Sequence, residues 1–161
     1  MRPYTGNTDG AATREGAGLR VLVNFLLKKY PGLWDNGTFG IRDMKGFAPG
    51  NLSVHGTGRA VDLSYRFMKA KGLGVRFRGR KQAVACANWL VANDDTLGLE
   101  MIIDYLPTKK APFGRTWKCT RDGWLTYTKL TVRGSDWLHV EIAPTQANSA
   151  ILMRQALARC T

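Results

Sequence analysis

Two short segments constrain the fold of this chain more than any other feature, because each alternates apolar and polar side chains. They are residues 59–65, RAVDLSY, and residues 136–144, DWLHVEIAP. Successive side chains of a strand point to opposite faces, so each segment predicts a strand with one apolar face. The residues of the two apolar faces are Val61, Leu63, Leu138, Val140 and Ile142.

The opposite faces of these two predicted strands are polar. Asp62 lies on that face of the first strand, and His139 lies on that face of the second, between Trp137 and Glu141. The only other histidine, His55, lies in a glycine-rich stretch directly before the first strand. The chain therefore carries a His, Asp, His set on strands or at the entry to a strand.

The remaining elements alternate irregularly along the chain, which favours an α+β fold over a doubly wound sheet. Apolar residues at helical spacing predict three helices, and apolar runs predict further strands. Thr13 and Thr145 are expected to cap the first and last helices, and Ile151, Leu152 and Leu157 are expected to point inward from the last. The expected helices cover 13–30, 80–94 and 145–160, and the expected strands cover 37–47, 97–106 and the region of Trp117.

Length and composition indicate one folded domain. The chain has 161 residues, of which 44% are hydrophobic and 22% charged, values typical of globular proteins. Residues 1–12 are polar and glycine-rich and are expected to form a loose lead-in, with no apolar core of a secretory signal and no run long enough to span a membrane. Three widely spaced cysteines predict neither a disulfide framework nor a thiolate metal site, and Cys86 is expected to be buried.

The net charge of +12 is the one extreme property of the composition. Such a charge predicts attraction to a polyanion, and nucleic acid, anionic lipid and an acidic bacterial wall all qualify. The basic segment 66–81, RFMKAKGLGVRFRGRK, is expected to be an exposed loop. Charge alone does not choose among these partners.

The His, Asp, His set has the donor types of a zinc site. A catalytic zinc has three protein ligands and a water, and it accepts imidazole nitrogen and carboxylate oxygen. A hydrolase also needs a base for the proton of that water, and Asp136 and Glu141 are the carboxylates nearest to His139 in sequence. Arg42 could stabilise an oxyanion as a fixed cation. Spacing alone leaves these roles open.

The segment 53–62, SVHGTGRAVD, resembles the S-x-H-x-x-G-x-A-x-D motif of the zinc D-alanyl-D-alanine peptidases and L-alanyl-D-glutamate endopeptidases. This family includes vancomycin-resistance dipeptidases and many bacteriophage endolysins. The five fixed positions are met by Ser53, His55, Gly58, Ala60 and Asp62.

A second segment, DWLHVE at 136–141, is similar to the family's D-H-x-H-V-E motif of phage-type members, with Trp137 in place of the first histidine. Many members carry glutamate where this chain has Asp136. A looser likeness links GTFGIRDMKG, residues 37–46, to a family segment whose arginine contacts the substrate carbonyl. Together the similar segments extend from about residue 38 to residue 143.

The resemblance implies a single zinc ion bound by His55, Asp62 and His139. It implies Asp136 as the general base, with Glu141 as the fallback, and Arg42 as the group that contacts the carbonyl. Ser53 either braces the loop or touches substrate. The implied fold is a small, mainly antiparallel sheet flanked by about three helices, similar to that of hedgehog and D,D-peptidase domains.

The implied function is a zinc-dependent peptidoglycan peptidase, a bacteriophage endolysin or its catalytic domain. We expect a monomer that is made in the host cytoplasm and acts on the wall after release, with acidic wall polymers attracting its positive charge. L-alanyl-D-glutamate, D-alanyl-meso-diaminopimelate and terminal D-alanyl-D-alanine bonds all stay open as substrates. The alternative is a basic, non-enzymatic module that binds nucleic acid or cell wall. For the peptidase that the resemblance implies, nucleic acid is not expected to be an obligatory partner.

Overall fold

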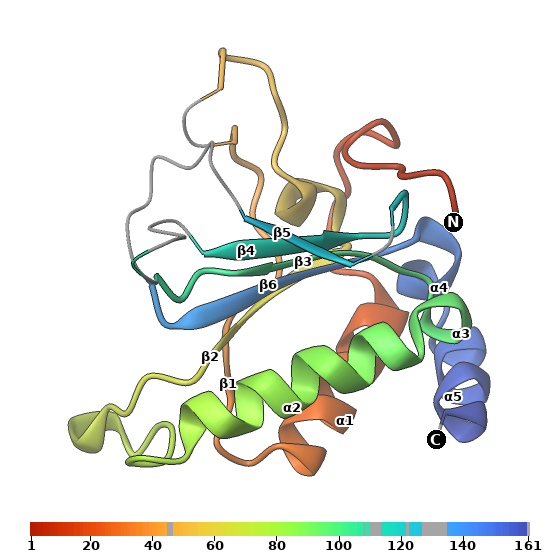
Figure 1. The fold of residues 1–161 in the computed structure, drawn as a ribbon. Helices are drawn as coiled ribbons and strands as arrows, with labels where there is room; N and C mark the ends of the chain where they lie inside the picture. Colours follow the sequence, from red (N-terminus) through yellow and green to blue (C-terminus); the bar gives the residue numbers. More distant parts are fainter. Residues whose placement is uncertain (45–46, 108, 110–113, 122, 127–134, 161) are drawn as a thin grey trace.

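The protein has an α+β fold in which one antiparallel sheet is covered by helices on one face (Figure 1). The structure is a computed structural model that describes residues 1–44, 47–107, 109, 114–121, 123–126 and 135–160. Six strands are hydrogen-bonded in the order β1-β2-β6-β3-β4-β5, and every neighbouring pair is antiparallel. The sequence prediction of fold class is confirmed.

The bounds of the elements are as follows. The strands are β1 (Trp34–Gly37), β2 (Ala60–Ser64), β3 (Leu99–Asp104), β4 (Arg115–Lys118), β5 (Trp124–Thr126) and β6 (Trp137–Ile142). The α-helices of the described residues are α1 (Ala17–Lys29), α2 (Gly79–Ala92), α3 (Asp94–Leu97), α4 (Pro144–Asn148) and α5 (Ala150–Arg159), and two short 3-10 helices are η1 (Val54–Thr57) and η2 (Lys69–Lys71). Three of the α-helices have ten or more residues. Among the described residues, none of the helices combines the length and the hydrophobicity that a membrane-spanning helix needs.

Strand register separates an apolar row from a polar row across the middle of the sheet. Val61 pairs with Val140, which pairs in turn with Ile102, and all three are fully buried under α1 and α2. Burial of each such side chain stabilises the fold by about 1.5–3 kcal/mol. The neighbouring row places Asp62 opposite His139 and therefore faces the other way, toward η1 and the N-terminal segment above the sheet in Figure 1.

The first helix begins later than its sequence predicts. The prediction that Thr13 caps this helix is wrong, because α1 starts at Ala17 with Gly16 as its N-cap. A Cβ atom at Gly16 would lie 2.3 Å from the carbonyl oxygen of Ala147, and one at Gly18 would lie 1.9 Å from that of Gln146. The close approach of α4 therefore requires glycine at both positions and sets the start of the helix.

Two other elements differ from their predictions. The strand expected over 37–47 has the wrong bounds, because β1 ends at Gly37. Beyond it the structure has an isolated bridge between Asp43 and Leu52, and residues 45–46 lie outside the described part. The helix expected over 145–160 is divided at Ser149, which caps α5 with its side chain in place of Thr145.

The inward face of α5 is also different from the prediction. The residues at its buried face are Met153 and Ala156, whereas Ile151 and Leu152 are 66% and 41% exposed. Only Leu157 of the predicted set packs against the core, in part. Met153 and Ala156 belong to the hydrophobic core, so tertiary packing and not apolar spacing alone decides which face of α5 points inward.

The N-terminal segment is bound to the sheet, whereas the sequence predicted a loose lead-in over 1–12. Arg2 donates to the carbonyl oxygen of Leu99 at 2.6 Å, and the Thr5 hydroxyl donates to Glu100 at 2.6 Å. The backbone amide of Ala12 donates to Gly56 at 2.8 Å, beside the histidine loop. These contacts place the segment on the polar face of the sheet.

Candidate metal centre

Strand pairing and one helical turn bring the His, Asp, His set together. Asp62 of β2 and His139 of β6 are direct register partners, and β2 continues backward into η1, which carries His55. One ligand atom from each of the three residues lies within 4.8 Å of the other two. The structure thus joins residues that are up to 84 positions apart in sequence.

The three donor atoms form a compact triangle. His55 Nε2 lies 3.2 Å from His139 Nδ1 and 3.4 Å from Asp62 Oδ1, and the distance between His139 Nδ1 and Asp62 Oδ1 is 2.9 Å. Zinc–ligand bonds of about 2.0–2.2 Å separate two ligands of a tetrahedral ion by roughly 3.3–3.6 Å. A small outward movement of the donors therefore fits one such ion, so these residues could hold a metal.

The loop before β2 fixes the position of His55. Ser53 caps η1 and accepts the backbone N–H of His55, while Gly58 ends the turn with a left-handed φ of 75°. A Cβ atom at Gly58 would lie 2.6 Å from the carbonyl oxygen of Arg14. Glycine is required here both for the backbone conformation and for this close approach.

Each imidazole has its second nitrogen bound on the far side from the triangle. His55 Nδ1 donates to the carbonyl oxygen of Thr38 at 2.9 Å, since a carbonyl can only accept. His139 Nε2 lies 2.9 Å from Oε1 of the buried carboxylate of Glu141 and donates to it. Both bonds leave the nitrogen that faces the triangle free to bind a metal, as outer partners of metal-bound histidines do.

The carboxylates of Asp62 and Glu141 favour the protonated form of His139. Burial lowers the pKa of His139, but its hydrogen bonds and charge interactions with Asp62 and Glu141 outweigh burial and raise that pKa to about 10. Burial raises the pKa of Asp62, and its bonds to both histidines outweigh burial and lower that pKa. The pocket therefore favours positive charge beside Asp62.

Glu141, predicted as the fallback base, supports His139. Its side chain is 3% exposed, with Oε1 accepting from His139 Nε2 and Oε2 accepting from the Tyr4 hydroxyl at 2.7 Å. Burial and the neighbouring Glu141 raise the pKa of Tyr4, which keeps the phenol protonated as a donor. A carboxylate with both oxygens engaged is better suited to hold His139 than to accept a proton from water.

Asp136, predicted as the base, lies at the entry to β6 and is partly exposed. Its carboxylate oxygens accept from Arg66 Nε at 2.8 and 3.0 Å. Among the described residues it has no hydrogen bond to His55, Asp62 or His139.

Arg42 and Ser53 lie on adjacent backbone segments beside the histidine loop. The Ser53 amide donates to the Arg42 carbonyl oxygen at 2.8 Å, and the Asp43–Leu52 bridge continues this pairing. The Arg42 side chain is exposed, whereas Ser53 is buried and caps η1. The hydrogen bond from the His55 backbone N–H to the Ser53 side chain supports the role of Ser53 in bracing the loop.

Three contributors to the site were missed by sequence reasoning, namely Tyr4, Thr38 and Arg66. Thr38 binds His55 through its backbone carbonyl oxygen, and every residue type has such an oxygen, so the sequence cannot indicate this contact. Tyr4 contacts Glu141 across 137 positions. Only the location of Arg66, directly after the first strand, offered a signal, because a cation there can reach the start of the paired strand.

No protein-family model, no curated protein and no solved structure matches this chain.

Proposed function

We propose that the protein is a zinc peptidase that hydrolyses an amide bond in peptidoglycan stem peptides or cross-links, as a bacteriophage endolysin or its catalytic domain. The triangle of His55, Asp62 and His139 is the observation that supports a bound metal. The resemblance of segments 53–62 and 136–141 to the zinc peptidase motifs supports the reaction. The donor set of two imidazoles and one carboxylate favours zinc.

Each residue of the site has a role in this proposal. Bound zinc would lower the pKa of a water molecule from 15.7 to about 7 and polarise the scissile carbonyl. Asp136 accepts the proton of the attacking water on its carboxylate and delivers it to the leaving amine. Arg42 donates to the carbonyl oxygen as negative charge develops there, and Ser53 holds the histidine loop in place.

The ion pair with Arg66 bears on the choice of Asp136. The Arg66 guanidinium binds both carboxylate oxygens of Asp136, at 2.8 and 3.0 Å, so this pair must open before either oxygen can accept a proton from water. Arg66 and Asp136 are 50% and 30% exposed, so rearrangement of this pair on substrate binding costs little. We infer that substrate displaces Arg66 from at least one carboxylate oxygen.

The experiment that tests the proposal combines metal analysis with mass spectrometry of digested peptidoglycan. Wild-type protein should contain one zinc per chain and release fragments with a new free amine, whose mass identifies the bond that is cut. Asp136→Asn should keep zinc and lose most of the hydrolysis. Asp35→Asn, which removes another arginine-paired carboxylate, 24% exposed, should keep both and is the matched control. Digestion that yields no new amine with zinc-loaded wild type would exclude the peptidase.

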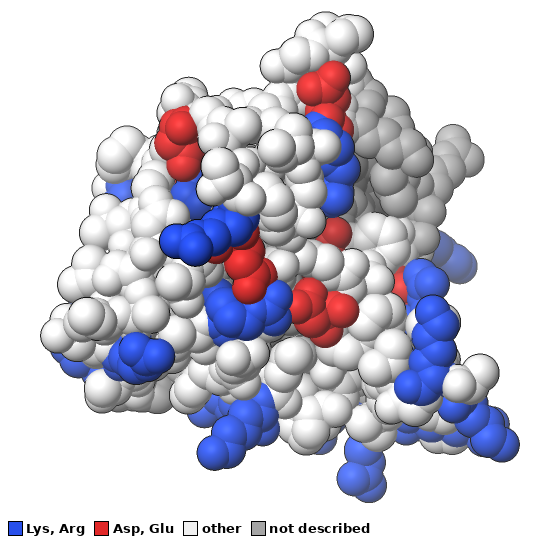
Figure 2. All heavy atoms as spheres, turned by 180° about the vertical axis from the view of Figure 1, so that it is seen from behind, with Lys and Arg blue, Asp and Glu red and all other residues white. Residues whose placement is uncertain are grey.

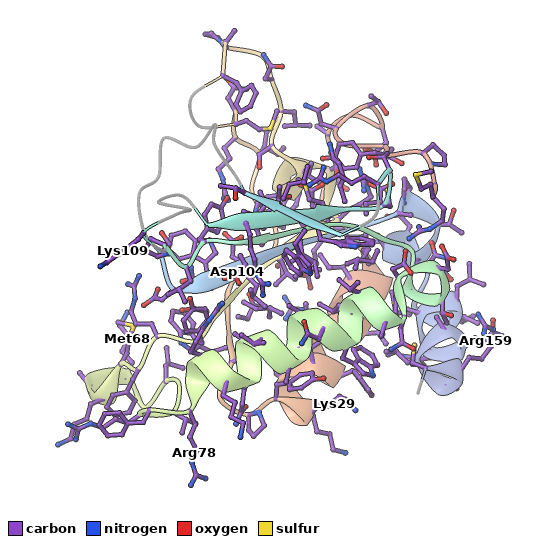
Figure 3. All side chains as sticks on the ribbon, viewed as in Figure 1. Lys29, Met68, Arg78, Asp104, Lys109 and Arg159 are labelled. Atoms are coloured by element: carbon purple, nitrogen blue, oxygen red, sulfur yellow. The ribbon has the colours of Figure 1, made fainter. Side chains whose placement is uncertain are left out.

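A second function, binding of a polyanion without catalysis, is favoured by segment 66–81. It carries exposed Lys69, Lys71, Arg76, Arg78 and Lys81 and no acidic residue. Figure 2 shows Lys and Arg side chains gathered at the lower right, where this segment lies, and Figure 3 shows Arg78 pointing away from the protein body. For a binding module, His55→Ala would leave function intact; for the peptidase it would abolish it.

A further inference from the structure

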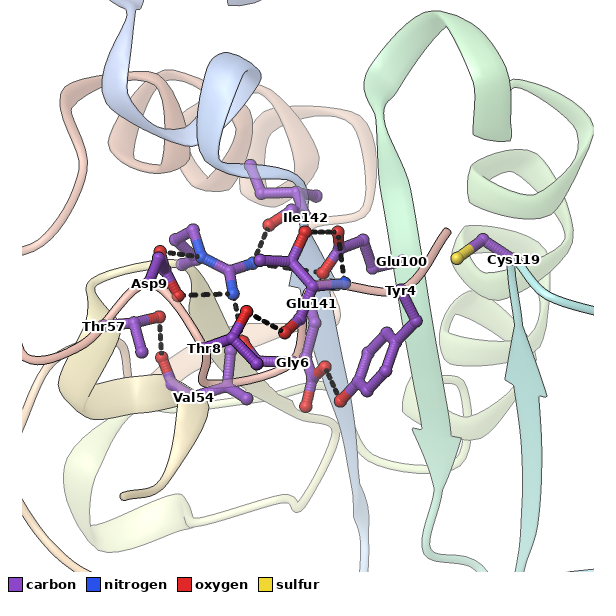
Figure 4. Close-up of polar contacts among 12 residues, drawn as sticks. Tyr4, Gly6, Thr8, Asp9, Val54, Thr57, Glu100, Cys119, Glu141 and Ile142 are labelled. Carbon is purple, nitrogen blue, oxygen red and sulfur yellow. Dashed lines mark hydrogen bonds and ion pairs between the residues drawn. The ribbon is translucent and has the colours of Figure 1, made fainter. Parts of the chain in front are cut away.

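A continuous chain of hydrogen bonds runs from the N-terminal segment to the metal triangle. The Tyr4 hydroxyl donates to Glu141 Oε2 at 2.7 Å, and Glu141 Oε1 accepts from His139 Nε2 at 2.9 Å. Figure 4 shows the Tyr4 ring pointing its hydroxyl at this carboxylate. The opposite nitrogen of the same imidazole, Nδ1, faces Asp62 and His55.

The Tyr4 ring has a second contact that fixes its position. The ammonium of Lys118 lies 3.6 Å from the ring centroid, on the strand row that also contains Glu141. This cation–π contact holds the ring over the sheet without involving the hydroxyl. Removal of the hydroxyl alone would therefore leave the ring in place.

The segment that carries Tyr4 is bound to the sheet by a buried arginine. Arg59 is fully buried and donates to both carboxylate oxygens of Asp9, at 2.8 and 3.1 Å, and to the carbonyl oxygen of Gly6. On its other side it donates to Glu100 at 3.2 Å and to the Ile142 carbonyl oxygen at 2.6 Å. Arg59 lies between the two motif residues Gly58 and Ala60, so the same loop that presents His55 also holds the N-terminal segment.

We propose that Tyr4 is a positioning residue of the metal centre, and that metal binding at His139 and docking of residues 2–9 stabilise each other. This inference rests on the metal-binding part of the proposed function and not on the peptidase part. Tyr4 fixes the rotation of the Glu141 carboxylate, which fixes the ring of His139. Without the hydroxyl, Glu141 Oε2 is left buried and unpaired, and the carboxylate turns away from the geometry that holds the imidazole.

Two variants of the same segment separate this role from a general effect on the fold. Tyr4→Phe removes the hydroxyl that binds Glu141, and Thr5→Val removes a neighbouring hydroxyl that binds Glu100 at 2.6 Å. Both changes delete one hydroxyl-to-carboxylate bond on the polar face, but only the first is connected to a metal ligand.

The test measures the affinity of the full chain for zinc by competition with a chromophoric chelator. Loss of an outer partner of a metal-bound histidine weakens binding by about 10–100-fold, and we expect Tyr4→Phe to fall near tenfold because it acts through Glu141. Thr5→Val should weaken zinc binding much less than Tyr4→Phe does, because it loosens the N-terminal segment without changing the contact to Glu141. The visible spectrum of the cobalt-substituted protein should change in Tyr4→Phe alone. Equal zinc affinities and equal cobalt spectra in wild type and Tyr4→Phe would overturn the inference.

Hydrogen exchange tests the coupling from the other end. Zinc should slow exchange of the Thr5 amide, which donates to Glu100, in wild type and less so in Tyr4→Phe. Exchange in residues 2–9 that zinc leaves unchanged in wild type would contradict the coupling. Failure of wild type to bind zinc at all would instead refute the proposed metal site, so the two failures are distinguishable.

Discussion

Arginine has opposite environments in two regions of this protein. Arg59, on the polar face of the sheet, is fully buried and bound by two carboxylates and two carbonyl oxygens. Arg76 and Arg78, in segment 66–81, are exposed, and no acidic residue occurs within that segment. The positive charge of Arg76 and Arg78 is therefore on the surface, whereas the buried charge of Arg59 is neutralised by Asp9 and Glu100. We therefore expect changes in the first region to alter stability, and changes in the second to alter association with a polyanion.

The largest expected effect is the loss of the buried arginine. Arg59→Met leaves the carboxylate of Glu100 buried without its cation, and breaking such a pair costs about 3–5 kcal/mol of unfolding free energy. Urea unfolding of Arg59→Met and of the exposed counterpart Arg78→Met measures the contrast. Arg78→Met should change stability by less than about 0.5 kcal/mol. Similar losses in both variants would contradict the difference between the two regions.

Metal removal is expected to have the next largest effect, and it acts on the buried region alone. A ligand that binds only the folded state adds about 2.7 kcal/mol when its free concentration is a hundred times its dissociation constant. Chelation should therefore lower the unfolding temperature of wild type and of Arg78→Met, but not that of His139→Ala. A wild-type melting curve that is the same with and without zinc would count against a metal at the triangle.

The sequence predicted the half of this site that depends on strand periodicity. The period of two placed Asp62 and His139 away from the core, and the apolar row of Val61 and Val140 confirms that separation. Helix α2 and strands β3 and β6 lie close to their predicted bounds for the same reason. Periodicity is a local property, so one sequence is enough to read it.

The other half depends on contacts between distant segments. Nothing in the N-terminal sequence distinguishes Tyr4, because its partner is chosen by how residues 1–12 fold back over β6. The start of α1 was mispredicted because the steric demand on Gly16 comes from Ala147, and the inward face of α5 was mispredicted because its packing against the core is set by distant segments. Tertiary contact decided each of these points, and local propensity could not.

The expected role of segment 66–81 in association is tested by binding to purified cell walls. Arg76→Glu together with Arg78→Glu should weaken wall binding at low salt, by about 1 kcal/mol or more, as expected for cations at an anionic surface. The effect should fade as salt rises, since the screening length drops from about 10 Å at 0.1 M to about 3 Å at 1 M. The control is Arg154→Glu together with Arg159→Glu, on exposed positions of α5. Equal losses in the two double variants would assign wall binding to net charge and not to segment 66–81.

The smallest expected effect concerns the support of His55. Glu15 accepts from Arg20 at 2.5 Å and from the Thr38 hydroxyl at 2.5 Å, and the carbonyl oxygen of the same Thr38 holds His55. The hydrogen bond from Arg20 lowers the pKa of Glu15, and burial opposes it more weakly. A carboxyl group whose pKa is lower in the folded state contributes stability above its unfolded value of 4.5, and that stability is lost as pH falls through the folded value.

Glu15→Gln should therefore lower the unfolding free energy at neutral pH by about 0.5 kcal/mol, since the pair is partly exposed to solvent. The difference from wild type should shrink as pH falls below 4.5, because protonation removes the same charge from the wild-type protein. Chemical unfolding at several pH values measures it, with Asp95→Asn as the control, since Asp95 pairs with Arg2 while its side chain is 80% exposed. A Glu15→Gln difference that stays constant from neutral to acid pH would mean that the lost stability comes from packing around Thr38, and not from the carboxylate charge.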